Sequence, residues 1–253
     1  YLQAVVGYKL DETLLELDST SDEELFPVET ANGTTSSMSF SLIYDRRNDR
    51  FAPTKGIFSR TFVEYAGLGG DLKYTKGGAN FRYYKTLFWE VVWRNNINYG
   101  FVSSNEDGVD VPFNTRYLLG GANTLRGYDW FSIGLRKRSQ IAYDNALANT
   151  GDEDEAEILA LRPFGGKQQL YYNLEFQFPL IKEAGILGVV FYDIGYADNA
   201  LRISDFKSDV GFGFRWFSPI GPLRFEWGFA LNPDEDFGED SDGNFMFAIG
   251  SPF

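Results

Sequence analysis

The chain has 253 residues, enough for one large all-β domain or two ordinary ones, and a formal net charge of −13. That charge argues against nucleic acid as a partner, because binding it needs clustered Lys and Arg to neutralise phosphates. With no Cys and no His, the chain has no disulfide framework, no Ser-His-Asp triad and no His-ligated zinc; we therefore expect no metal, no cofactor and no enzymatic activity.

No stretch approaches the roughly 18 consecutive apolar residues of a transmembrane helix, and the mean hydropathy is −0.27. A transmembrane β-barrel stays possible, because its lipid-facing side chains occupy only every second position. Aromatic residues make up 17% of the chain, and there are 27 Gly; both fit a barrel with aromatic girdles, but a soluble β-sandwich also gathers aromatics. No signal peptide precedes Tyr1, so we expect a mature or trimmed fragment.

The first half of the chain shows strand patterns of uneven clarity. Residues 1–10 read as a strand, and large apolar side chains alternate clearly over 38–44 and 89–101. The stretches 56–66 and 72–83 also read as strands, but their register is ambiguous.

The second half holds five successive strands, each with one face made only of large apolar residues, which brings the expected total to about ten strands. These faces are Leu170, Tyr172, Leu174, Phe176 and Phe178; Val190, Tyr192, Ile194 and Tyr196; Val210, Phe212, Phe214 and Trp216; Leu223, Phe225, Trp227, Phe229 and Leu231; and Phe245, Phe247 and Ile249.

The opposite faces of these strands distinguish a barrel from a sandwich. They mix Gly and Ala with isolated charges of both signs, namely Asp193, Arg215, Arg224 and Glu226. A sandwich would show Lys, Glu and Thr to bulk water, whereas small residues and lone charges suit a confined, hydrated lumen.

The connections between strands point the same way. Long acidic connections at about 11–34, 102–167, 197–207 and 232–243 alternate with shorter turns at about 45–55, 84–88, 179–185 and 218–222, and only the link near 66–72 is short on the long side. Long loops on one side and short turns on the other are typical of outer-membrane barrels. We therefore predict an all-β fold, a transmembrane antiparallel β-barrel in a bacterial outer membrane.

The longest of these connections contains an unusual segment, residues 117–128. Gly120-Gly121 is followed by Leu125-Arg126-Gly127-Tyr128, and this run resembles the (V/L)RG(F/Y) loop motif of the outer-membrane barrel assembly and transport superfamily. The runs 173–176, 191–195 and 213–226 also match the family in order, and the last one favours its assembly factors. The alternative is that the Gly-Gly pair simply forms an ordinary turn.

The resemblance implies a sixteen-stranded barrel preceded by POTRA domains, of which residues 1–253 would be the seventh to sixteenth strands. The first six strands and all POTRA domains would then lie outside this chain. It also implies that Arg126 folds into the barrel and pairs with acidic residues at the positions of Glu175 and Asp193. The alternation independently places both carboxylates on the lumen face, where an arginine could bind them through charge-assisted pairs. Unrelated, solvated lumen charges are the alternative.

The last strand carries a second pattern. Phe245, Phe247, Ile249 and Phe253 form an alternating aromatic strand that resembles the C-terminal recognition signal of outer-membrane barrels. Gly250 and Pro252 should weaken its pairing, which would leave a frayed edge as one lip of a lateral seam. A simple last lipid-facing strand explains the same pattern.

The function implied by the resemblance is a non-enzymatic assembly factor that inserts client barrels into the membrane through strand pairing at the seam. Its partners would be unfolded outer-membrane client proteins, accessory outer-membrane lipoproteins and the lipid bilayer. A polypeptide-secretion transporter of the same superfamily is the main alternative, and a passive porin is a weaker one. The acidic runs 152–157 and 234–242 lack an EF-hand pattern, so we expect solvated loops there and no metal site.

Overall fold

A computed structural model describes residues 1–16, 25–26, 31–200, 202–218, 221–234, 239, 241–251 and 253. Strands dominate it, with two helices and four short 3-10 turns. The strands are β1 Leu2–Thr13, β2 Gly33–Asp45, β3 Gly56–Ala66, β4 Tyr74–Thr86, β5 Val92–Ser104, β6 Arg136–Arg138, β7 Leu161–Pro163, β8 Gln168–Ile181, β9 Ile186–Asp198, β10 Lys207–Ser218, β11 Gly221–Ala230 and β12 Asn244–Ile249. The helices are α3 Gln140–Thr150 and α4 Glu153–Ala160, and the 3-10 turns are η1 Phe88–Glu90, η2 Phe113–Thr115, η3 Lys182–Ala184 and η4 Ile203–Asp205.

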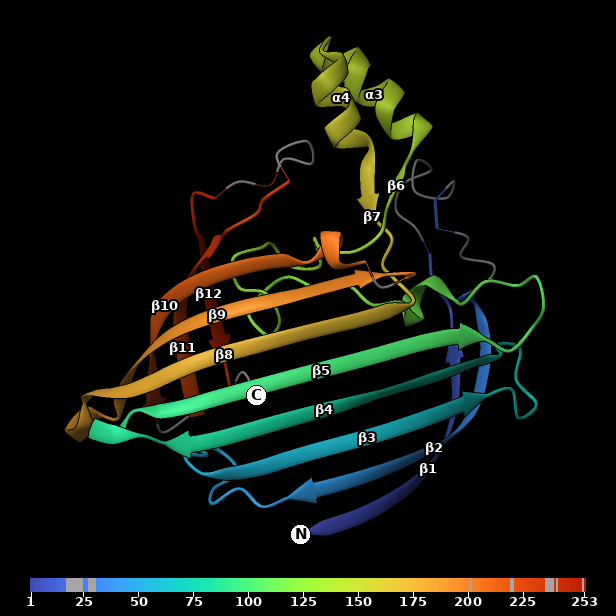
Figure 1. Cartoon of the computed structure of the whole chain (residues 1–253). Coiled ribbons are helices and arrows are strands. Elements are labelled where there is room, and N and C mark those ends of the chain that lie inside the picture. Colours follow the sequence, from blue (N-terminus) through green and yellow to red (C-terminus); the bar gives the residue numbers. More distant parts are fainter. Residues whose placement is uncertain are drawn as a thin grey trace.

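Ten of these strands form one antiparallel sheet in the order β1-β2-β3-β4-β5-β8-β9-β10-β11-β12. Figure 1 shows them side by side as a tilted sheet that curves around a lumen. β1 and β12 are the two edges of this sheet, and β6 pairs separately with β7. The prediction of about ten antiparallel strands of a barrel is confirmed. Among the described residues, no helix is long and apolar enough to cross a membrane.

The two faces of the sheet differ as the alternation predicts. On β8 the lumen-facing Asn173, Glu175 and Gln177 are at most 7% exposed, whereas the outward Phe176 is 37% exposed. On the last strands the outward aromatics pack across strand pairs, with ring centroids 4.8 Å apart for Phe214 and Phe225 and 5.2 Å apart for Phe225 and Phe247. A wide outward band of exposed aromatic and aliphatic side chains suits lipid rather than water.

Two outward positions differ from the expectation. Tyr196 is only 1% exposed, because the ring of Phe206 covers it at a centroid distance of 4.8 Å. Leu231 lies one residue beyond the end of β11.

The long connection between β5 and β8 is more ordered than the loop expected at 102–167. The β6–β7 hairpin leads to α3 and α4, which project beyond the end of the sheet in Figure 1. Ser139 caps α3 by accepting from the Ala142 N–H, and Asp152 caps α4 by accepting from the Asp154 and Glu155 N–H groups. The acidic run 152–157 is therefore a helix start, where carboxylates are favoured by the helix dipole, and not a loop. Part of the second acidic run, residues 235–238 and 240, lies outside the described residues.

The chain after β12 does not continue the outward strand, which corrects the expectation for Phe253. Gly250 has φ 104°, a conformation suited to glycine, and its N–H donates to the Pro222 carbonyl at 2.7 Å. Beyond it Phe253 is only 5% exposed: Arg94 lies 4.8 Å above its ring and donates to its backbone oxygen at 3.0 Å. A strand pattern read locally could not anticipate this contact with β5. Pro252 lies outside the described residues.

Candidate functional site

Part of the β5–β8 connection, residues 117–128, folds into the lumen and is buried there. Leu119 and Leu125 are 0% exposed and Tyr128 is 2% exposed, in a cluster with Ile133, Ala197 and Ala230. Gly120 and Gly121 have φ values of 105° and 92°, which make a tight turn accessible only to glycine at low cost. The Gly121 N–H donates to the carbonyls of both Leu125 and Tyr128 at 3.0 Å, so the segment is a compact, self-bonded structure.

Arg126 anchors this segment to the barrel wall. Its Nε and Nη2 donate to the two carboxylate oxygens of Asp193 on β9, both at 2.7 Å. Its Nη1 donates to Glu175 on β8 at 2.6 Å and to Glu226 on β11 at 3.2 Å. The guanidinium also lies 3.5 Å from the ring centroid of Phe191. One arginine of the loop thus contacts three strands through paired, charge-assisted bonds.

A second layer of arginines surrounds the same carboxylates. Arg215 on β10 donates to Glu175 and Glu226, at 2.6 Å each, and Arg94 on β5 lies 3.1 Å from Glu175. Both arginines also donate to the Gln177 side chain, at 3.1 and 3.0 Å. The network therefore links five consecutive strands of the sheet, β5, β8, β9, β10 and β11.

The network is buried. It contains four arginines and three carboxylates, each at most 3% exposed: Arg94, Arg126, Arg215 and Arg224, with Glu175, Asp193 and Glu226. The carboxylate of Asp209 on β10 is equally buried nearby, but it has no hydrogen-bond partner among the described residues. Buried charges are tolerated only when paired, and loss of one partner leaves an uncompensated charge that costs about 3–5 kcal/mol. The arrangement can hold the loop segment rigidly.

Two glycines let the loop backbone touch the wall. A Cβ on Gly228 of β11 would lie 2.4 Å from the carbonyl carbon of Arg126, and a Cβ on Gly127 would lie 2.5 Å from the Cβ of Asp209. Only glycine permits such backbone-to-wall distances. The small residues of the lumen face therefore make room for the Arg-Gly-Tyr segment.

Asn173 adds a neutral contact beside the charges. Its amide nitrogen donates to Asp193 at 2.8 Å and to the Thr124 carbonyl at 2.6 Å. Asn96 on β5 donates in turn to the Asn173 oxygen at 2.9 Å. The carboxylate that receives Arg126 is thus itself oriented from two further strands.

The structure brings together most of the site residues singled out in the sequence, and leaves some apart. Arg126, Glu175 and Asp193 are in direct contact, and Gly120, Gly121, Leu125, Gly127 and Tyr128 form the segment that carries Arg126. Phe245, Phe247 and Ile249 lie on the outward face of β12, at least 50% exposed and away from this network. Phe253 is buried beside Arg94 instead.

The sequence reasoning did not identify the roles of Arg94, Asn173, Arg215, Arg224 and Glu226. The alternation placed Arg215, Arg224 and Glu226 on the lumen face, but it gave no sign that they share acceptors with Arg126. Arg94 was harder to find, because the run 94–96 places polar residues at successive positions and hides the two-residue period.

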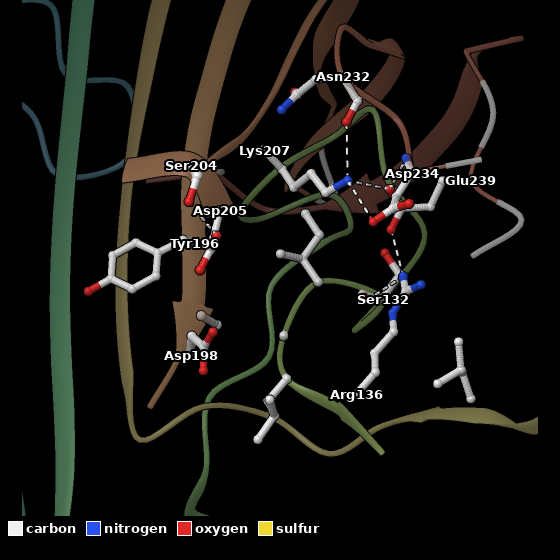
Figure 2. A pocket seen from close by; sticks show the side chains of 15 residues that line it. Ser132, Arg136, Tyr196, Asp198, Ser204, Asp205, Lys207, Asn232, Asp234 and Glu239 are labelled. Carbon is white, nitrogen blue, oxygen red and sulfur yellow. Dashed lines mark hydrogen bonds and ion pairs between the residues drawn. The ribbon is translucent and has the colours of Figure 1, made fainter. Parts of the chain in front are cut away.

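A cavity of about 400 Å³ opens on the long-loop side, above the network. Figure 2 shows Arg136 and Lys207 converging on Glu239 there, with contacts of 2.6 and 3.1 Å. These ion pairs tie the β11–β12 connection to the β6 strand and to the start of β10. In the described part of the chain, no group of three or more acidic residues is arranged to hold a metal ion.

Known proteins resemble this chain in sequence. The family model of the Omp85 superfamily domain matches residues 1–253. The outer membrane protein assembly factor BamA of Nitratidesulfovibrio vulgaris is 30% identical over 255 residues, covering 98% of this chain and 29% of that protein. The chain thus spans less than a third of the length of this relative.

Solved structures share the fold at lower identity. BamA from Haemophilus ducreyi lacking POTRA domains 1–3 superposes with a TM-score of 0.73 at 22% identity, over 99% of this chain and 51% of that one. CdiB from Acinetobacter baumannii gives a TM-score of 0.55 at 14% identity, over 87% of this chain and 34% of that one.

Proposed function

The chain belongs to the Omp85 superfamily, and from this premise we propose that it is the C-terminal part of the barrel of an outer-membrane assembly factor. The factor folds client barrel proteins and inserts them into the outer membrane by strand pairing at a lateral seam. Its partners are unfolded client proteins, accessory outer-membrane lipoproteins and the bilayer itself. The long connection predicted at 102–167, which carries the Arg-Gly-Tyr motif, belongs to the extracellular side of the barrel, and POTRA domains precede the chain in the whole protein. The relative named as an assembly factor at 30% identity over nearly the whole chain supports this choice within the superfamily.

The observation that carries the proposal is the short edge strand β12. It pairs with β11 over six positions, from Leu223 opposite Ile249 to Gly228 opposite Asn244, and β11 is its one partner among the described strands. Its outward side chains are apolar, and its chain turns inward at Gly250. A client strand in lipid gains backbone hydrogen bonds from such an edge that the bilayer does not offer.

The buried loop segment favours this function over a passive porin. Residues 117–128 lie in the lumen at the level of Arg126 and are bonded to three strands there, β8, β9 and β11. A porin keeps an open aqueous channel along its axis. We therefore assign the segment a role in holding the barrel wall beside the seam.

The secretion transporter remains the second candidate, because it would pass its substrate through the lumen and not along the edge. Site-directed disulfide formation separates the two routes. These 253 residues contain no native Cys, so each introduced cysteine is the single thiol of this part of the protein. We would place cysteines at Phe247 on β12, Ser39 on the lumen face of β2 and Phe81 on the lipid face of β4. Each is combined with a series of single cysteines along the last strand of a client barrel, in the whole protein reconstituted into vesicles.

An assembly factor gives cross-links at Phe247→Cys that recur at every second client position, because paired strands alternate their faces. Phe81→Cys, which also lies on the lipid face but on a strand within the sheet, is the matched control and should not react. Cross-links concentrated at Ser39→Cys would instead assign transport through the lumen and overturn the proposal.

A further inference from the structure

We propose that Arg224 is a positioning residue that clamps the tip of the lumen loop, residues 120–124, onto β11 and thereby fixes the edge strand β12. This inference rests on the proposed function, since it concerns how the seam is held. It concerns a contact separate from the ion pairs of Arg126.

Two side-chain nitrogens of Arg224 donate hydrogen bonds to the loop tip. Its Nη1 donates to the Ala122 carbonyl at 3.0 Å and its Nη2 to the Asn123 side-chain oxygen at 2.8 Å. The side chain is 2% exposed, and Ala122 is 1% exposed. A planar guanidinium can reach a backbone oxygen and an amide oxygen at once, in a fork that Lys cannot reproduce.

A plain structural ion pair explains Arg224 less well. Its nearest carboxylate is Glu226, at 3.7 Å, outside hydrogen-bond distance. Glu226 already accepts from Arg215 at 2.6 and 2.9 Å and from Arg126 at 3.2 Å. The short, directed contacts of Arg224 are those with the loop, so its specific role is to bind the tip.

Successive lumen-facing positions of β11 contact successive parts of the loop. Arg224 binds residues 122–123, Glu226 binds Arg126, and Gly228 lies against the backbone of Arg126 and Gly127. Ala230 then packs in the cluster with Leu119, Leu125 and Tyr128. The lumen face of β11 from Arg224 to Ala230 is therefore a docking surface for the loop. Arg224 binds the tip of the loop at one end of this surface.

The same positions of β11 face the edge strand directly. Arg224 is paired with Ala248 and Glu226 with Met246 in the ladder between β11 and β12. On the other side of the tip, Asn173 of β8 donates to the Thr124 carbonyl at 2.6 Å. The tip thus braces β11 against β8, and β12 receives its support from β11.

Amide hydrogen exchange tests the clamp, in the whole protein reconstituted into phospholipid vesicles without a client. Arg224→Met keeps the aliphatic length and removes the donors. We expect exchange at residues 120–124 to rise about tenfold or more, as expected when hydrogen bonds to a charged group are lost, and exchange in β12 to rise with it. Arg224→Lys should restore only part of the protection, because it offers a single ammonium in place of the fork.

The matched control is Arg82→Met on β4, a lumen arginine that donates to Asn80 at 2.7 Å and has no hydrogen bond to the loop tip among the described residues. It should leave both segments unchanged. Asn123→Ala offers a milder test that keeps every buried charge, and it should add no further exchange in the Arg224→Met background if the two residues form one contact.

Unchanged exchange at residues 120–124 in Arg224→Met overturns the clamp, and a freed tip with unchanged β12 overturns the link to the edge strand. These results stand apart from the proposed function, because no client is present. A separate client-insertion assay tests that function. If the unaltered protein inserts no client, the assembly proposal fails while the exchange comparison keeps its meaning.

Discussion

The guanidinium of Arg126 donates hydrogen bonds to both carboxylate oxygens of Asp193, at 2.7 Å each, although the two residues lie 67 positions apart in the chain. Paired bonds of this kind fix orientation as well as distance, because both nitrogens and both oxygens must lie near one plane. The loop segment is therefore held in one position against β9. In this position the remaining nitrogen of the Arg126 guanidinium reaches Glu175 on β8 and Glu226 on β11.

Arg126→Ala should free the loop segment from the lumen. The substitution leaves Asp193 buried without its arginine and removes one of the three arginines around Glu175. Loss of the partner of a buried charge costs about 3–5 kcal/mol and favours withdrawal of the loop. Limited proteolysis should cut residues 105–135 faster than in the unaltered protein, and client insertion should fall. Arg138→Ala, which removes a more exposed arginine paired with Glu157 in the same connection, is the control. Equal protease sensitivity in Arg126→Ala and the unaltered protein would count against the anchoring role.

Gly228→Ala tests the close approach without touching a charge. The added Cβ would lie 2.4 Å from the Arg126 carbonyl carbon and 2.5 Å from the Gly127 nitrogen, and both are backbone atoms that cannot rotate away. We expect the ion pairs to lengthen and the loop to become as protease-sensitive as in Arg126→Ala. Gly7→Ala is the matched lumen-face control, since its Cβ meets only the Ser39 hydroxyl, which can rotate. A resistant loop in Gly228→Ala would show that the wall can move to make room.

The sequence predicted well which residues face the lumen. It predicted less well which of these residues are in contact with one another. Alternation alone put Glu175 and Asp193 on one face, because successive side chains of a strand point to opposite sides. The contact with Arg126 depends on the path of a long connection, which no local pattern encodes; there the family motif supplied the expectation. Arg94 and Phe253 show the limit most clearly, since their contact joins β5 to the residues after β12.

The helices α3 and α4 were missed for a different reason. Residues 140–150 hold several apolar side chains, but these do not gather on one face of the helix, so the hydrophobic pattern gives only a weak helix signal there. The cap residues Ser139 and Asp152 and the glycine at 151 were present in the sequence as start and stop signals.

Glu239→Gln should loosen the connection between β11 and β12 at the long-loop side. Glu239 is paired with Arg136 at 2.6 Å and Lys207 at 3.1 Å, and each contact loses its charge in the variant. A spin label at Ser241→Cys should report greater mobility, with an effect of about 1 kcal/mol for partly exposed pairs. Glu157→Gln, which loses the pair between α4 and Arg138 on β6, should not alter the mobility of that label. An unchanged spin-label spectrum in Glu239→Gln would mean that other contacts hold the connection between β11 and β12.

Asp110 should make the start of the β5–β8 connection sensitive to acid. Its carboxylate receives Arg116 at 2.6 Å and Lys167 at 2.7 Å. Burial alone would raise the pKa of Asp110, but hydrogen bonds from Lys167 and the Val111 N–H, together with the Arg116 charge, hold that pKa below its ordinary value. The folded connection thus favours the ionised form. The stabilisation is complete above the ordinary Asp pKa, near about pH 4, and is lost as the pH falls through the lowered value.

A spin label at Asp107→Cys measures this acid response. Its mobility should stay constant from about pH 7 to pH 5 and increase below about pH 4, as Asp110 takes up a proton and releases Arg116 and Lys167. Asp110→Asn is the matched control, because it is neutral at every pH and should show the mobile spectrum throughout. If Asp110→Asn still changed its spectrum below about pH 4, the acid response would not come from Asp110.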